Sequence, residues 1–104
     1  MIEATIIYDL LPNIDEGAYW EFIKKAAAIA MQAPNIEEFR AHRDVLSAPR
    51  VRITTVWPDL TDWAAFTQGS EWQALDTEVR KFVCNFETSI WTPSPFLNEP
   101  YHPQ

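Results

Sequence analysis

The segment from residue 51 to residue 91 constrains the fold more than any other part of the chain. It opens with VRITTVW, a run of β-branched and apolar residues that predicts a strand over residues 51–57. A Pro-Asp pair follows, then a tryptophan-rich region of helical spacing over residues 63–82. The segment ends with VCNFETSIW, whose alternation predicts a strand over residues 83–91. This order predicts a strand-helix-strand unit.

The helical region of this unit is predicted to be broken in two. Thr61 is a suitable N-cap for a short first helix, because its hydroxyl can accept a hydrogen bond from a free N–H of the first turn. Gly69 is expected to end that helix, and Ser70 to cap a second one from Glu71 to about Phe82. A broken helix leaves space above a sheet, so a cavity is expected beneath it.

The first half of the chain repeats the same plan. ATIIYDLL predicts a central strand over residues 4–11, and either Asn13 or Asp15 can cap a helix over residues 17–33. Alternating charged and apolar residues then predict a half-solvated edge strand over residues 36–45. The resulting order, β-α-β-β-α-β, predicts an α+β, ferredoxin-like domain with a four-stranded antiparallel sheet and helices on one side.

Residues 1–92 are expected to form this single domain, and residues 93–104 a Pro-rich C-terminal tail. Four prolines prevent regular structure in the tail, yet it also carries apolar residues. Two alternatives stay open for it: an arm that lies over a partner subunit, or a disordered end.

Both faces of the predicted sheet carry large apolar side chains. Ile6 adjoins Ile7 in one strand, and Val56 adjoins Trp57 in another, so each pair places one side chain on each face. Helices cover one face only. We therefore expect the other face to meet a second copy of the chain, in a homodimer with two-fold symmetry.

Composition excludes several classes of partner. Fifteen acidic against eight basic residues give a net charge of -7, which is the wrong sign for a protein that binds nucleic acid. The apolar stretch over residues 26–31 is too short to span a membrane, and the N-terminus lacks a signal-peptide pattern, so a cytoplasmic protein is expected. Cys84 is the single cysteine, and its apolar surroundings predict a buried side chain.

The segments TTVW, LTDWAAFTQGSEWQAL and FETSIW resemble the dimeric α/β-barrel superfamily, and within it the small antibiotic-biosynthesis-monooxygenase-like (ABM-like) proteins. The resemblance implies a dimeric α/β barrel and a monooxygenase that needs no cofactor and acts on an aromatic or polyketide-like substrate. The superfamily also includes haem-degrading enzymes and proteins of no known reaction. A non-catalytic dimeric binding module is therefore the alternative, and a haem-binding relative a third possibility.

The haem-degrading branch has an Asn on its first strand and a Trp and a His ten residues apart in its second helix. With Ser70 as the reference point, those helix positions fall on Thr67 and Thr77, and the first strand contains no Asn. This argues against haem degradation by that triad. Trp63, one turn before Thr67, leaves a shifted arrangement open.

Cofactor-free oxygenation needs a group that handles a proton and donors that stabilise an enolate or phenolate. His42 or Tyr8 could handle the proton, and Arg43 or Arg52 could stabilise the anion. The alternatives are a buried, hydrogen-bonded tyrosine and an edge strand whose charges only keep it soluble.

Aromatic and amide side chains could hold the ring of a substrate. The candidates for substrate binding are Trp57, Trp63, Trp72 and Asn85. The alternative for the tryptophans is a place in the core or in a subunit interface. No metal site is predicted, because His102 is the only other imidazole.

Overall fold

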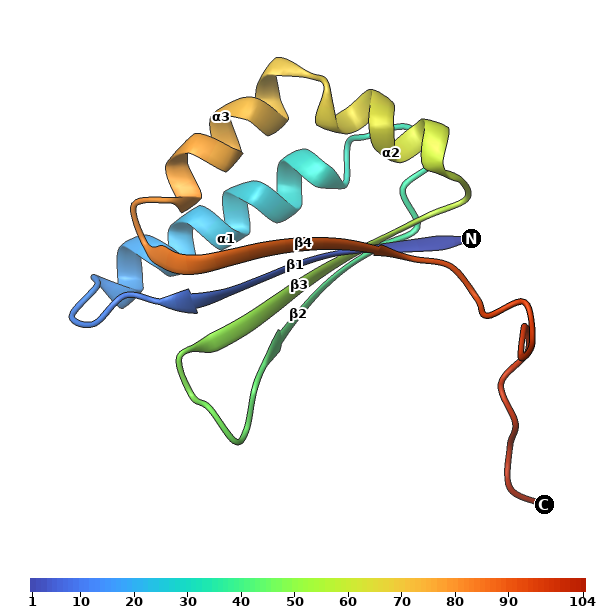
Figure 1. Ribbon diagram of the computed structural model, residues 1–104. Helices are drawn as coiled ribbons and strands as arrows, with labels where there is room; N and C mark the ends of the chain where they lie inside the picture. The colour runs from blue at the N-terminus through green and yellow to red at the C-terminus, as the bar shows by residue number, and fades with distance from the viewer.

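A four-stranded antiparallel sheet forms one layer of the molecule, and three helices form the other (Figure 1). The computed structural model describes residues 1–104. The strands are β1 (Ile2–Leu10), β2 (Glu38–Arg43), β3 (Arg50–Trp57) and β4 (Val83–Trp91), in the order β2-β3-β1-β4. The helices are α1 (Glu16–Ala30), α2 (Leu60–Thr67) and α3 (Ser70–Val79). The ferredoxin-like β-α-β-β-α-β prediction is confirmed, including the central place of the first strand and the broken second helix.

The predicted helix caps are right for α1 and wrong for α2 and α3. Asp15 caps α1, since its carboxylate accepts a hydrogen bond from the backbone N–H of Ala18 at 3.0 Å. Asp59 caps α2, because it stands before the first turn, whereas Thr61 lies inside the helix. Ser70 is the first residue of α3 and gives it no side-chain cap. α3 ends at Val79, three residues earlier than predicted, so that a turn can lead into β4.

The core lies between the sheet and the helices. Its ten buried residues are Tyr8, Tyr19, Phe22, Ile23, Ala26, Val51, Ile53, Leu75, Val79 and Val83. Trp20 of α1 lies outside this core: 57% of it is exposed, and its ring lies 5.6 Å from the ammonium of Lys24. The buried side of α1 is formed by Tyr19, Phe22, Ile23, Ala26 and Ala30.

The pairing of the strands assigns each side chain to a face of the sheet. In β1, Ala4, Ile6 and Tyr8 point to the helices, while the alternate residues point to the opposite face, here called the open face. Val56 lies on the open face between Glu3 and Glu38 of the neighbouring strands. It is only 1% exposed, because Arg40 bridges these two carboxylates above it. Part of this face is thus covered by its own ion pairs.

A bulge at Asn85 overturns the expected alternation of β4. Asn85 has a φ of 54°, and the register with β1 shifts between Ile7 and Asp9. The extra residue places Cys84 opposite Asp9 on the open face, where it is exposed. The prediction of a buried Cys84 is therefore wrong, since strict alternation does not hold across a bulge.

Beyond β4 the chain runs away from the two layers (Figure 1). Residues 92–104 contain no helix and only one isolated bridge, between Ser94 and Leu97. Phe96 is 97% exposed. None of the helices has the length and apolar character needed to cross a membrane.

Candidate functional site

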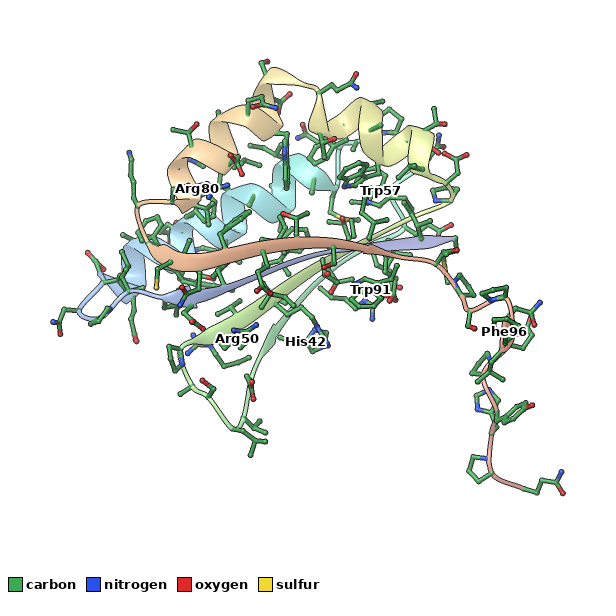
Figure 2. All side chains as sticks on the ribbon, viewed as in Figure 1. His42, Arg50, Trp57, Arg80, Trp91 and Phe96 are labelled. Atoms are coloured by element: carbon green, nitrogen blue, oxygen red, sulfur yellow. The ribbon has the colours of Figure 1, made fainter.

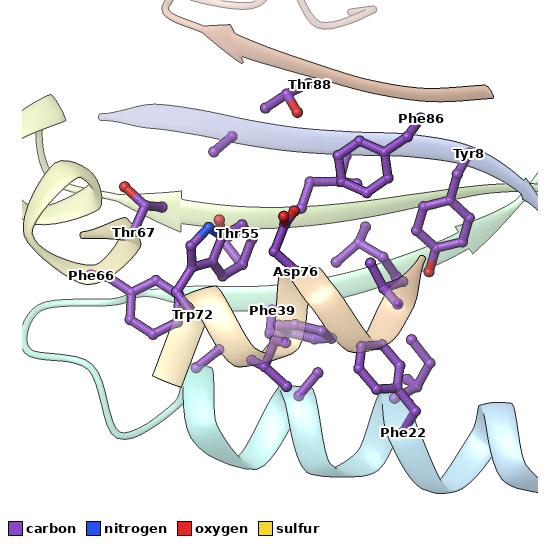
Figure 3. Close-up of a pocket in the computed structure, with 18 of the residues that line it drawn as sticks. Tyr8, Phe22, Phe39, Thr55, Phe66, Thr67, Trp72, Asp76, Phe86 and Thr88 are labelled. Carbon is purple, nitrogen blue, oxygen red and sulfur yellow. The ribbon is translucent and has the colours of Figure 1, made fainter. Parts of the chain in front are cut away.

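A cavity of about 280 Å³ lies between the helix-facing side of the sheet and the helices (Figure 3). Fifteen of its twenty lining residues are hydrophobic. Only two lining residues are exposed, Arg80 at the end of α3 and Thr88 on the edge strand β4. The cavity therefore opens to solvent between α3 and β4. Its volume is near the lower end of the range of about 300–1,000 Å³ for ligand pockets, which suits a small planar molecule.

Sequence explains why this space is not filled. Small side chains, Ala4 from β1 and Ala26 and Ala30 from α1, form part of the wall where larger ones would occupy the volume. The helix break at Gly69 separates α2 from α3, so the two helices cover the sheet at an angle to each other (Figure 1). The predicted cavity beneath the broken helix is present.

Aromatic rings close the end of the cavity beneath α2. Phe66 of α2 lies 5.5 Å from Trp57 and 5.5 Å from Trp72, between ring centroids. Trp63, Phe66 and Trp72 line the cavity, whereas Trp57 lies behind them and is completely buried. Figure 3 shows Phe66 and Trp72 together at this end and Tyr8 at the other.

The opposite end is lined by a buried phenol, Tyr8, which is hydrogen-bonded to a second buried phenol outside the lining, Tyr19. The hydroxyls of Tyr8 and Tyr19 are 2.6 Å apart, and the ring of Tyr8 stacks on Phe86 with centroids 6.2 Å apart. Burial, followed by the hydrogen bond to Tyr19, raises the pKa of Tyr8 far above its usual value. Tyr8 is therefore neutral at physiological pH. It can donate or accept a hydrogen bond, but it is not a ready base.

One carboxylate and one cation line the cavity. Asp76 lies in α3, and Arg80 directly follows this helix. The guanidinium of Arg80 lies 4.0 Å above the ring of Phe86, and its Nη2 is 3.4 Å from Oδ1 of Asp76. The other polar side chains of the lining are those of Tyr8, Thr55, Thr67 and Thr88, together with the indole N–H groups of Trp63 and Trp72. Thr67 donates its hydroxyl proton within α2, to carbonyls of the preceding turn.

Three of the predicted site residues, Tyr8, Trp63 and Trp72, line this cavity. His42 and Arg52 do not. They are opposite each other in the β2–β3 pairing and lie on the open face, where both are exposed. Figure 2 shows His42 on the side of the sheet opposite Arg80 and Trp57. The sheet therefore separates His42 and Arg52 from a ligand held in the cavity.

The remaining predicted residues lie outside the lining. Arg43 is exposed at the end of β2, where its Nη1 donates to the carbonyl oxygen of Ala48 at 3.0 Å. Its charge tends to lower the pKa of Tyr19 against the larger, opposite effect of burial. Trp57 donates through Nε1 to Oγ1 of Thr55. Asn85 donates through Nδ2 to Oδ2 of Asp9 at 2.9 Å. Catalytic and binding roles for these residues remain predictions.

Four lining residues were not predicted as site residues from the sequence: Asp76, Arg80, Phe86 and Thr88. A signal for the first two was present. Asp76 and Arg80 each follow a core residue of α3 by one position, Leu75 and Val79, so they lie at the margin of its buried face. Of the two helix positions that align with the Trp and His of the haem-degrading branch, Thr67 lines the cavity and Thr77 is exposed on α3.

No protein-family model matches the sequence, and no curated protein matches it significantly. Solved structures do match. A point variant of SnoaB, a cofactor-independent oxygenase from Streptomyces nogalater, superimposes with a TM-score of 0.80 over 94% of this chain and 97% of that chain, at 13% identity. A protein from Deinococcus radiodurans assigned as an antibiotic biosynthesis monooxygenase also gives 0.80, over 100% and 99% of the chains, at 10% identity. The chain has the antibiotic biosynthesis monooxygenase fold.

The TM-scores establish the ABM fold. Identities this low do not establish a reaction, which has to be inferred from the site. A conserved protein from Methanosarcina mazei, whose description names no activity, has the same fold, with a TM-score of 0.78 at 8% identity over 86% of this chain and 89% of that chain. The ABM fold thus occurs with and without a named reaction.

Proposed function

We propose that the protein binds a small planar aromatic molecule in its cavity and oxygenates it with molecular oxygen. The observation that supports this most is the apolar cavity with an aromatic end and a polar end, in a fold shared with a cofactor-independent oxygenase. Trp63 and Trp72 would hold the ring at the aromatic end. The reacting carbon would lie near Tyr8.

The chemistry can proceed through the substrate itself. Loss of a proton to solvent water from a carbon conjugated with a carbonyl, which in anthrone is the CH₂ across the central ring, gives an enolate, whose electrons form a carbon–oxygen bond with O₂. Protonation yields a hydroperoxide. Breaking its O–O bond, with loss of the remaining hydrogen on that carbon, releases water and leaves a carbonyl. For anthrone, C₁₄H₁₀O and O₂ give anthraquinone, C₁₄H₈O₂, and water. Tyr8, neutral and buried, is placed to donate a hydrogen bond that stabilises the peroxide anion, which takes its proton from water.

Tyr8→Phe is expected to lower kcat for anthrone oxidation by about 100-fold, as for the loss of a hydrogen-bond donor to a developing oxyanion, while KM changes by less than about threefold. The matched control is Tyr19→Phe, which removes the same hydrogen bond from a residue outside the lining. We expect its effect on kcat to stay below about tenfold. Oxygen uptake and anthraquinone absorbance measure the rates. Equal losses in both variants would mean that the hydroxyl of Tyr8 only positions its neighbours.

A non-catalytic binding module is the second candidate. The observation in its favour is the lack of a free base in the lining, since its only carboxylate, Asp76, is paired with Arg80. Saturable binding of anthrone with no oxygen uptake above the uncatalysed rate would decide for the module. A Soret band on titration with haemin would instead favour a haem-binding relative.

We also infer that the chain forms a homodimer through the open face. Trp91 lies there 57% exposed, and its Nε1 donates to Oγ1 of Thr5. Ile7, in the same strand as Thr5, adds a half-buried apolar side chain. Light scattering at about 10 µM should give twice the mass of 12.0 kDa. Ile7→Asp should shift the protein toward monomer, and Trp20→Asp, on the exposed side of α1, should not. A monomeric wild-type protein would contradict this interface.

A further inference from the structure

We infer that the cavity selects aromatic ligands that carry one negative charge, and that Arg80 is the residue that binds this charge. The inference rests on the proposed function, because it assumes that a planar ligand occupies the cavity. It names the chemical class of that ligand, an aromatic carboxylate or an ionised phenol or enol.

The position of Arg80 is suited to an anion at the mouth. Arg80 directly follows α3, and its side chain is 53% exposed, so the guanidinium is at the boundary between the cavity and solvent. The ring of Phe86 supports it from the β4 side, at 4.0 Å. It is the only cationic residue among the twenty that line the cavity.

The hydrogen-bonding capacity of Arg80 is largely unused within the chain. A guanidinium has five N–H donors, and the single side-chain partner of Arg80 is Asp76, at the long distance of 3.4 Å. A ligand carboxylate or phenolate can therefore form shorter, charge-assisted hydrogen bonds to the free donors. Asp76 is partly exposed and can turn to water when a ligand binds.

The rest of the molecule restricts where an anion can bind and how many charges it can carry. Apart from the hydroxyl of Tyr8, the interior of the cavity is mostly apolar, so a permanent charge on a bound ligand would lose most of its hydration there. The ring therefore belongs inside and the charge at the mouth. Asp76 remains close by, and the chain as a whole carries -7, so a second negative charge on the ligand would be repelled. These conditions favour a monoanion.

Two probes of equal shape test the inference, 2-naphthoate and 2-naphthamide, measured by isothermal titration calorimetry at neutral pH. The wild-type protein should bind naphthoate about tenfold more tightly than naphthamide, the ratio expected for a charge-assisted hydrogen bond near solvent. Arg80→Gln should remove this preference and leave naphthamide binding unchanged. Lys81→Gln is the matched control, because it removes the same charge from the adjacent, exposed residue outside the lining.

The possible outcomes distinguish failure of the role of Arg80 from failure of the proposed function. Equal binding of both probes by the wild-type protein, or a preference that survives Arg80→Gln, overturns the role of Arg80 and leaves aromatic binding intact. Failure of the wild-type protein to bind either probe overturns both. Should Arg80→Gln lose its far-UV circular dichroism, Asp76→Asn decides instead. Removing the competing carboxylate should strengthen naphthoate binding relative to naphthamide, and an unchanged ratio overturns the inference.

Discussion

Trp57→Ala is expected to destabilise the protein by about 3–5 kcal/mol, the usual cost of truncating a buried tryptophan. Trp57 has no exposed surface, and its ring packs against Phe66 with centroids 5.5 Å apart. Its Nε1 also donates to Oγ1 of Thr55 at 2.8 Å. The substitution would leave a void beneath α2 and remove a hydrogen bond. Urea unfolding followed by far-UV circular dichroism measures the change in the free energy of unfolding.

Trp20→Ala is the matched control for this substitution, because it removes the same side chain from the exposed side of α1. Trp20 is 57% exposed, and the ammonium of Lys24 lies over its ring. We expect a change within about 0.5 kcal/mol, as for most surface substitutions. A loss below about 1 kcal/mol for Trp57→Ala would contradict a close-packed, fully buried position for this side chain.

The sequence contained enough information for the order of elements and for much of the sheet. Apolar content distinguished the central strand β1 from the charged edge strand β2, because burial on two faces and exposure at an edge demand different side chains. The glycine-serine pair located the break between α2 and α3 within one residue. These features depend on neighbours close in sequence, so local patterns could predict them.

The candidate site was predicted less well, because it depends on how distant elements meet. Alternation of side chains along β2 places His42 and Arg43 on opposite faces of the sheet, but only the pairing with β3 shows that His42 is on the open face. The bulge at Asn85 reversed the parity of β4 and exposed Cys84. Spacing along α3 marks Arg80 as marginal to its buried face, but only the packing of β4 against α3 places it over Phe86.

The mouth of the cavity is the place where ligand binding can be tested most directly. Thr88 points from β4 toward the helices, opposite Ile6, and is one of two exposed residues in the lining. Thr88→Trp should place an indole in the opening between α3 and β4. An exposed position on an edge strand tolerates an aromatic residue, so we expect the fold to persist.

Thr88→Trp is expected to weaken the binding of 2-naphthoate by about 100-fold or more, because the ligand and the new indole cannot occupy the same space. Thr88→Val is the matched control. It removes the hydroxyl but keeps the shape of the side chain, and we expect affinity within about threefold of the wild-type value. Calorimetry measures both, with circular dichroism to verify the fold. If Thr88→Trp bound naphthoate as tightly as Thr88→Val, the ligand would have to bind elsewhere. The roles assigned to Tyr8, Trp72 and Arg80 would then lose their common basis, since all three depend on a ligand that enters between α3 and β4.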